Sequence, residues 1–156
     1  MQVHRGTSAV WEVAYHIVWC PKYRKSLPGS VLRTLRTSLC SIAEAREWSI
    51  KSMEVMPDHI HLFIEAPPSE SPTGIVKVLK GTTAKVLFER HSALRTMFQH
   101  GHIWSPSYYI GTVGYVSEDT VRRYVQEQRQ RTVGRPRKDR ISSPQQVEGS
   151  PCEESS

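Results

Sequence analysis

The residues of this chain whose types and spacing best suit chemistry are His59 and His61, which lie one residue apart in the segment PDHIHLFIE. The segment alternates as a β-strand does, so both imidazoles would leave the same face. Their Cα atoms would lie about 6.6 Å apart, close enough for two ring nitrogens to reach one metal ion. On spacing alone, structural histidines on a half-buried sheet face are the commoner explanation. A metal site therefore needs further ligands from elsewhere in the chain.

A predicted helix near the end of the chain carries two more polar side chains of interest. Ser117 suits its N-cap, acidic residues follow in the first turn, and apolar residues recur at helical spacing. Tyr124 and Gln128 are then neighbours one helical turn apart. The side-chain oxygen of Gln128 would add a third neutral ligand to the two histidines, leaving positions on the ion for water and a phosphate oxygen.

Tyr124 is the candidate nucleophile of such a site. A phosphodiester needs a Lewis acid to offset the charge on its oxygens and a nucleophile in line with the leaving oxygen. A tyrosine ester would conserve the energy of the broken bond, so a cut strand could be rejoined to another end. The structural alternative is a tyrosine of the core.

The elements that must position these residues are predicted from periodicity. Residues 10–19 and 50–56 alternate as strands, and a turn at residues 57–58 joins the second to the histidine strand as an antiparallel hairpin. A further short strand is predicted within the aromatic segment 104–114, whose rings are either core side chains or platforms for stacked bases.

Two helices are predicted to cover the sheet. The first runs from Ser30, as N-cap, to about Trp48. The second opens with Ser71 as cap and Pro72 at the first helical position. Gly81 interrupts it, and is either a tolerated glycine or the mark of a close approach to the backbone.

Net charge points to an anionic partner. The chain carries +6 although only 23% of its residues are charged, a bias for which nucleic acid is the first candidate. Lys22, Tyr23 and Arg24 place cations around an aromatic ring, which suits a phosphate backbone with a base stacked on the ring. The alternative is a solvated basic loop. Lys80 adds positive charge on the second helix.

Length and composition predict one folded domain, residues 1–131, followed by a disordered tail, residues 132–156, rich in Ser, Pro and Gly. Cys20, Cys40 and Cys152 are odd in number and widely spaced, which predicts reduced thiols in a cytoplasmic protein. The sequence shows neither an apolar run long enough to span a membrane nor a secretory signal.

Together these residues resemble the single-tyrosine HUH transposases of small bacterial and archaeal insertion sequences, which move as single-stranded DNA. The resemblance runs from about Tyr15 to Gln128. It is carried by HIVW (16–19), KYR (22–24), PDHIHL (57–62), LKG (79–81), WS (104–105), Tyr108, GTVG (111–114), RYV (123–125) and Gln128.

The resemblance implies roles for the candidate residues. His59 and His61 are the histidines of the HUH motif, Tyr124 is the nucleophile and Gln128 is the third ligand of a Mg²⁺ or Mn²⁺ ion. The implied fold is α+β, a ferredoxin-like (RRM-like) antiparallel sheet with helices packed on it, in which a C-terminal helix carries the nucleophilic tyrosine. The candidate DNA contacts are Lys22, Tyr23, Arg24, Lys80 and Arg123.

The implied function is a transposase that cleaves and rejoins single-stranded DNA at insertion-sequence ends. Similar proteins recognise end hairpins, form a 5′-phosphotyrosine, and act as homodimers in which the tyrosine helix of one subunit completes the histidine site of the other. One departure is Gly114-Tyr115, where related chains tend to have paired glycines. If that pair is the hinge of the tyrosine helix, its swing between cis and trans arrangements would be stiffer here.

Other functions remain compatible with the sequence. An HUH nickase of replication or conjugation would use similar chemistry, and a retired transposase would bind hairpin DNA without cutting it. A non-catalytic RRM-like module would need stacking aromatics on its central strands, where the histidine strand offers imidazoles and only Phe63.

Overall fold

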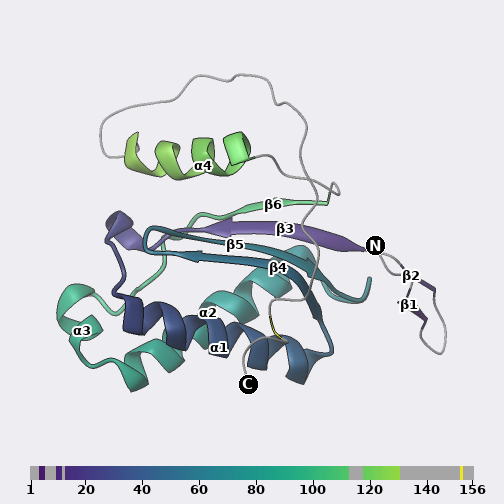
Figure 1. The fold of residues 1–156 in the computed structure, drawn as a ribbon, viewed down its shortest axis with the longest axis horizontal. Coiled ribbons are helices and arrows are strands. Elements are labelled where there is room, and N and C mark those ends of the chain that lie inside the picture. The colour runs from purple at the N-terminus through teal and green to yellow at the C-terminus, as the bar shows by residue number, and fades with distance from the viewer. Residues whose placement is uncertain (1–3, 6–9, 12, 113–117, 131–151, 153–156) are drawn as a thin grey trace.

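The computed structural model describes residues 4–5, 10–11, 13–112, 118–130 and 152. Its central feature is a four-stranded antiparallel sheet with strand order β4-β5-β3-β6 (Figure 1). A separate two-stranded sheet pairs β1 with β2 near the N-terminus. The strands are β1 (His4–Arg5), β2 (Val10–Trp11), β3 (Ala14–Trp19), β4 (Ser49–Met56), β5 (His59–Glu65) and β6 (Tyr109–Gly111).

Strand β5 behaves as its alternation predicts. Ile60, Leu62 and Ile64 are fully buried, while His59 and His61 on the other face are half-buried. β4 and β5 form the predicted hairpin, and β3 pairs with β5 on its other side. The strand predicted over 10–19 is divided, because β2 joins the separate small sheet and β3 begins only at Ala14.

Helices α1 (Gly29–Arg46) and α2 (Pro72–Arg90) pack on the apolar face of the sheet, and α4 (Glu118–Gln130) lies over the opposite face (Figure 1). Burying one leucine or isoleucine side chain contributes about 1.5–3 kcal/mol, so this layer dominates the stability of the domain. The fully buried side chains include Ile17, Trp19, Leu35, Leu39, Ile60, Leu62, Ile64, Ile75, Leu79 and Leu87.

Of the two predicted helix starts, the structure confirms that of α2 and corrects that of α1. Ser30 is not the N-cap of α1, because the extended Pro28 occupies that position and its carbonyl accepts from the Leu32 amide at 3.1 Å. Ser71 is the N-cap of α2, and its Oγ accepts from the Gly74 amide at 3.0 Å. α2 continues through Gly81, where an added Cβ would meet nothing within 4 Å. That glycine is therefore a tolerated one.

The segment after α2 contains a short helix, α3 (Ala93–Met97), that was not predicted from the sequence. The short strand predicted within 104–114 is β6. The proposed cap Ser117 and the Gly114-Tyr115 pair lie outside the described residues. The four-stranded antiparallel sheet with helices packed on it confirms the predicted α+β, ferredoxin-like fold.

Two cysteines correct the prediction of reduced thiols. Cys40 of α1 and Cys152 form a disulfide, with their Cα atoms 5.9 Å apart and a sequence separation of 112. Wide spacing along the chain carries no information about proximity in space, which is why the pair was not predicted. Cys20 is a buried free cysteine, and the rest of the predicted tail lies outside the described residues. Within the described part of the chain, no helix is long and apolar enough to span a membrane.

Candidate active site

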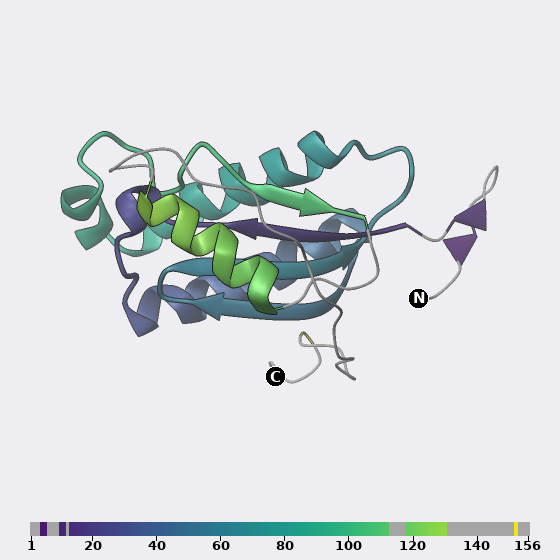
Figure 2. The same cartoon turned by 90° about the horizontal axis from the view of Figure 1, so that it is seen from above.

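One face of the sheet carries the predicted histidines, and α4 lies over it. His61 pairs with Val18 of β3, and residues paired across strands share a face. Val18 and Cys20 are buried against Val121 and Val125 of α4. α4 therefore covers the histidine face, and Figure 2 shows it crossing the strands diagonally. The strand and the helix that carry the predicted chemistry thus meet on one face.

His59 is oriented by the residue before it. Its Nδ1 lies 2.9 Å from Asp58 Oδ1, and Asp58 Oδ2 accepts from Arg24 Nη2 at 3.3 Å. A carboxylate can only accept, so Nδ1 carries the proton and Nε2 keeps the lone pair that a metal ion would bind. The Arg24 side chain is 9% exposed, so this ion pair is largely shielded from solvent. Arg24 and Asp58 therefore hold the first predicted ligand in one orientation.

His61 lies in a more enclosed setting among other histidines. Its Nε2 is 3.3 Å from His16 Nδ1, and its Nδ1 is 3.8 Å from Glu54 Oε2. Burial lowers the pKa of His61 to about 4, and the nearby His16 and His59 act in the same direction. The ring is therefore neutral near pH 7, the form that can bind a metal ion. His16 is itself buried and stacks on Phe63, with ring centroids 4.3 Å apart.

Tyr124 and Gln128 meet at one serine. Ser107, in the segment before β6, donates from Oγ to Gln128 Oε1 at 2.9 Å and lies 3.2 Å from the Tyr124 hydroxyl. The Tyr124 ring also lies beside the ring of Tyr109 in β6, with centroids 6.4 Å apart. Tyr124 and Gln128, which lie one turn apart on α4, are therefore anchored near the edge strand β6.

The predicted ligands offer nitrogen and oxygen donors to a divalent ion. Among the residues that the structure describes, no group of three or more His, Cys, Asp or Glu side chains could hold a metal ion. A site built on His59 and His61 would therefore take its third protein ligand from another residue type. The amide oxygen of Gln128 is the predicted candidate, and with the two histidines it would make an uncharged set of two nitrogens and one oxygen. By donor type, such a set would suit a divalent ion that keeps open positions for a phosphate.

The candidate DNA contacts fall into two groups. Tyr23, in the short 3-10 helix η1 (Lys22–Arg24), is 64% exposed, with Lys22 Nζ and Lys25 Nζ at 5.5 and 5.9 Å from its ring centroid. An exposed ring between two cations retains the geometry expected for base stacking. Arg24 instead faces Asp58.

Lys80 also points into the protein. Its Nζ donates to the carbonyl oxygens of Ser105 at 2.6 Å and Ser107 at 3.4 Å, and burial lowers its pKa. Arg123 is half-buried on α4. The contacts of Lys80 support the segment that carries Ser107.

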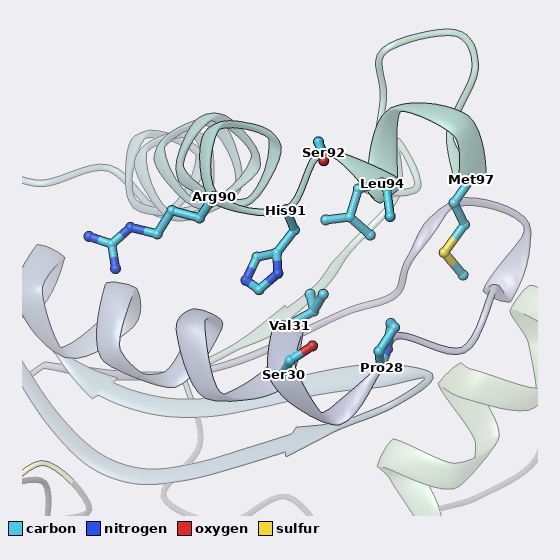
Figure 3. Close-up of a pocket in the computed structure, with 9 residues that line it drawn as sticks. Pro28, Ser30, Val31, Arg90, His91, Ser92, Leu94 and Met97 are labelled. Carbon is cyan, nitrogen blue, oxygen red and sulfur yellow. The ribbon is translucent and has the colours of Figure 1, made fainter.

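A cavity of about 320 Å³ lies elsewhere, between the start of α1 and the end of α2 (Figure 3). His91 projects into it and its Nε2 is 2.7 Å from Thr34 Oγ1 of α1. Because α1 and α2 cover the apolar face, this cavity is on the opposite side of the sheet from the histidines (Figure 1). It is therefore separate from the candidate active site.

Sequence reasoning missed two residues that the site uses. Asp58 was assigned only to a turn, although a carboxylate directly before a candidate ligand is a signal for an orienting partner. Ser107 was one serine of an irregular segment, and nothing in the local pattern distinguishes it. The structure also places His16, the first residue of the HIVW motif, against His61.

Comparisons with known proteins identify the family of this chain. A family model described as "Transposase IS200 like" matches residues 9–128. The chain is 35% identical over 129 residues to the ISDra2 transposase TnpA of Deinococcus radiodurans, covering 82% of this chain and 92% of that relative. It is 33% identical over 105 residues to the transposase for insertion sequence element IS200 of Salmonella typhimurium, covering 67% of this chain and 69% of that relative.

A solved structure agrees as well. The crystal structure of a putative transposase from Deinococcus radiodurans superposes with a TM-score of 0.73 at 32% sequence identity, covering 80% of this chain and 97% of the other. The match over residues 9–128 includes β3, the histidine strand and α4 as far as Gln128. The chain therefore belongs to the IS200-like transposase family.

Proposed function

We propose that this transposase cuts and rejoins single-stranded DNA at the ends of an insertion sequence, with Tyr124 as the nucleophile. In this proposal His59, His61 and Gln128 bind a Mg²⁺ or Mn²⁺ ion. The observation that carries it is that Tyr124 and Gln128 lie on α4, the helix that covers the histidine face of the sheet. A tyrosine, an amide and two histidines on one face are the parts that the reaction needs.

The reaction divides between the ion and the residues around it. The bound ion would offset negative charge on the non-bridging oxygens of the scissile phosphate. The Asp58 carboxylate accepts from His59 Nδ1 and leaves Nε2 with its lone pair, and burial keeps His61 neutral at working pH. Tyr124 Oη loses its proton and forms a bond to phosphorus, while the bond from phosphorus to the 3′ oxygen breaks and that oxygen gains a proton. Rejoining is the reverse attack by a 3′-hydroxyl.

DNA recognition in this proposal uses η1, the short basic helix that follows β3. Tyr23 and its flanking lysines offer a stacking platform for an unpaired base, and the net charge of +6 favours the phosphate backbone. End hairpins are the proposed substrate because of the resemblance to the single-tyrosine HUH transposases.

We also propose a homodimer whose sites are completed in trans. α4 packs on its own sheet here through a small buried cluster of Val18, Cys20, Val121 and Val125. The α4 of a second copy would make the same contacts, so an exchange of this helix between subunits would cost few interactions.

The test is formation of a covalent protein-DNA adduct. Labelled single-stranded oligonucleotides from the flanks of the gene are incubated with protein and Mg²⁺, then run on a denaturing gel. We expect an adduct that disappears with EDTA and with Tyr124→Phe. Tyr109→Phe is the matched control, because it removes the hydroxyl of a neighbouring ring on the same face and should leave the adduct intact.

The same assay separates the alternatives. Adduct formation without joining of a second strand would indicate a nickase. Tight hairpin binding without any adduct would contradict the proposed activity and indicate a DNA-binding protein. An adduct that survives Tyr124→Phe would assign the nucleophile to another residue.

A further inference from the structure

Ser107 lies between the two side chains of α4 that the proposed chemistry needs. Its Oγ donates to Gln128 Oε1 at 2.9 Å, and the Tyr124 hydroxyl is 3.2 Å away. A serine hydroxyl has one proton and two lone pairs. Because the proton is directed to Gln128, the Tyr124 hydroxyl is the donor to Ser107. One hydroxyl thus sets the direction of both side chains.

Ser107 is in turn held by a cation from α2. Lys80 Nζ donates to the carbonyl oxygens of Ser105 and Ser107, and lies 5.7 Å from the centroid of the Tyr108 ring. This lysine is partly buried, and an ammonium group that leaves water needs such acceptors. Its place is therefore fixed by the carbonyls that it binds.

The segment has further attachments to the sheet and to α2. The Ser105 amide donates to the Cys20 carbonyl at 2.9 Å, and Trp104 Nε1 donates to Thr83 Oγ1 at 3.0 Å. These bonds tie the segment to the end of β3 and to α2 on its two sides. Ser107 therefore projects from a well-anchored backbone, as a positioning group requires.

We propose that Ser107, held by Lys80, is a positioning residue that sets Tyr124 and Gln128 for the reaction. The proposal rests on the roles of Tyr124 and Gln128 in the proposed function. An amide oxygen has two lone pairs, so Gln128 can keep the bond from Ser107 while the other lone pair faces an ion. Partners of this kind orient metal ligands, and their loss commonly weakens metal affinity about 10–100-fold.

The first test measures metal affinity and adduct formation. Ser107→Ala should raise the Mn²⁺ concentration for half-maximal adduct formation about tenfold and lower the rate at saturating Mn²⁺, with hairpin DNA affinity unchanged. Ser107→Thr keeps the hydroxyl and should restore both values. Ser105→Ala is the matched control. It removes the neighbouring hydroxyl, which lies 3.4 Å from Ser107 Oγ, but no bond to α4, so both values should stay close to those of the unaltered protein.

The second test measures how firmly α4 is docked on the sheet, by a method that does not depend on catalytic activity. Ser107→Ala and Lys80→Met should each speed amide hydrogen exchange in α4, residues 118–130, relative to β5, in protein whose circular dichroism is unchanged. The double variant should add little to either single variant, because both changes act on one chain of contacts. Unchanged exchange in α4 and an unchanged Mn²⁺ requirement would overturn the proposal.

The outcomes separate this inference from the proposed function. If the unaltered protein forms no adduct, the proposed activity fails while hydrogen exchange still decides whether Ser107 docks α4. If Ser107→Ala speeds exchange in α4 but leaves adduct formation and Mn²⁺ affinity unchanged, the serine is structural only and the positioning role is wrong.

Discussion

The histidine strand and the tyrosine helix are built in different ways. β5 is an inner strand with ladders to β4 and β3 on its two sides, and its apolar face is fully buried. α4 is held on the sheet by two buried valines and by the bonds at Ser107. Elements with few buried contacts open at lower free energy than the core. The histidine strand is therefore part of the core, whereas the tyrosine helix is docked on it.

Truncating one buried side chain in the histidine strand and one in the tyrosine helix should give the largest contrast. Leu62→Ala, in β5, should lower the free energy of unfolding by about 2–5 kcal/mol, because it leaves a cavity among fully buried residues. Val125→Ala, in α4, should lower it by less than about 1 kcal/mol while speeding amide exchange in α4 alone. Urea denaturation and hydrogen exchange measure both. Equal losses from the two variants would show that α4 belongs to the same cooperative unit as the sheet.

The second-largest effect should be a loss of folding stability at acid pH, caused by His61. The pKa of His61 is lowered from 6.5 to about 4 in the folded protein, mainly by burial. Between these values the unfolded state binds more protons, so stability falls as pH drops from about 6.5 to about 4, by up to about 3 kcal/mol. Thermal melts in EDTA across this range, compared with His61→Gln, isolate the effect. A variant curve as steep as the original would show that His61 is not the source of the loss.

Loss of the His59 orientation should have a smaller, metal-specific effect. Asp58→Asn keeps the shape of the side chain but removes the charge that holds His59 and pairs with Arg24. We expect Mn²⁺ affinity to fall about 10–100-fold with little change in the melting temperature. Glu54→Gln is the control, since Glu54 lies 3.8 Å from His61 and is exposed. Equal effects from both variants would indicate a general loss of negative charge.

The smallest expected effect is on the reactivity of Cys20, whose thiol is buried beneath α4. Burial raises the pKa of Cys20 to about 12, with Asp58 contributing in the same direction. The thiolate is the reactive form, so Cys20 should react very slowly with a thiol reagent at pH 8. Val125→Asp, which undocks α4, should speed the reaction. Rapid labelling of the unaltered protein would mean that α4 leaves the sheet readily.

Local patterns in the sequence by themselves determined much of this protein. Period-two alternation placed His59 and His61 on one face of β5, because strand geometry depends on neighbouring residues alone. Helical spacing placed Tyr124 and Gln128 one turn apart for the same reason. The order of the motifs indicated the family that the comparisons confirm.

Only the tertiary structure decided which side chains support these four. Ser107 is 17 residues from Tyr124, and Arg24 is 34 residues from Asp58 in sequence. The partners Cys40 and Cys152 are separated by 112 residues. Such pairs depend on how the sheet, α2 and α4 pack, and no local periodicity reports the distance between packed elements. Spacing in the sequence therefore placed the candidate groups on their strand and helix, whereas the contacts that orient them arise from long-range packing.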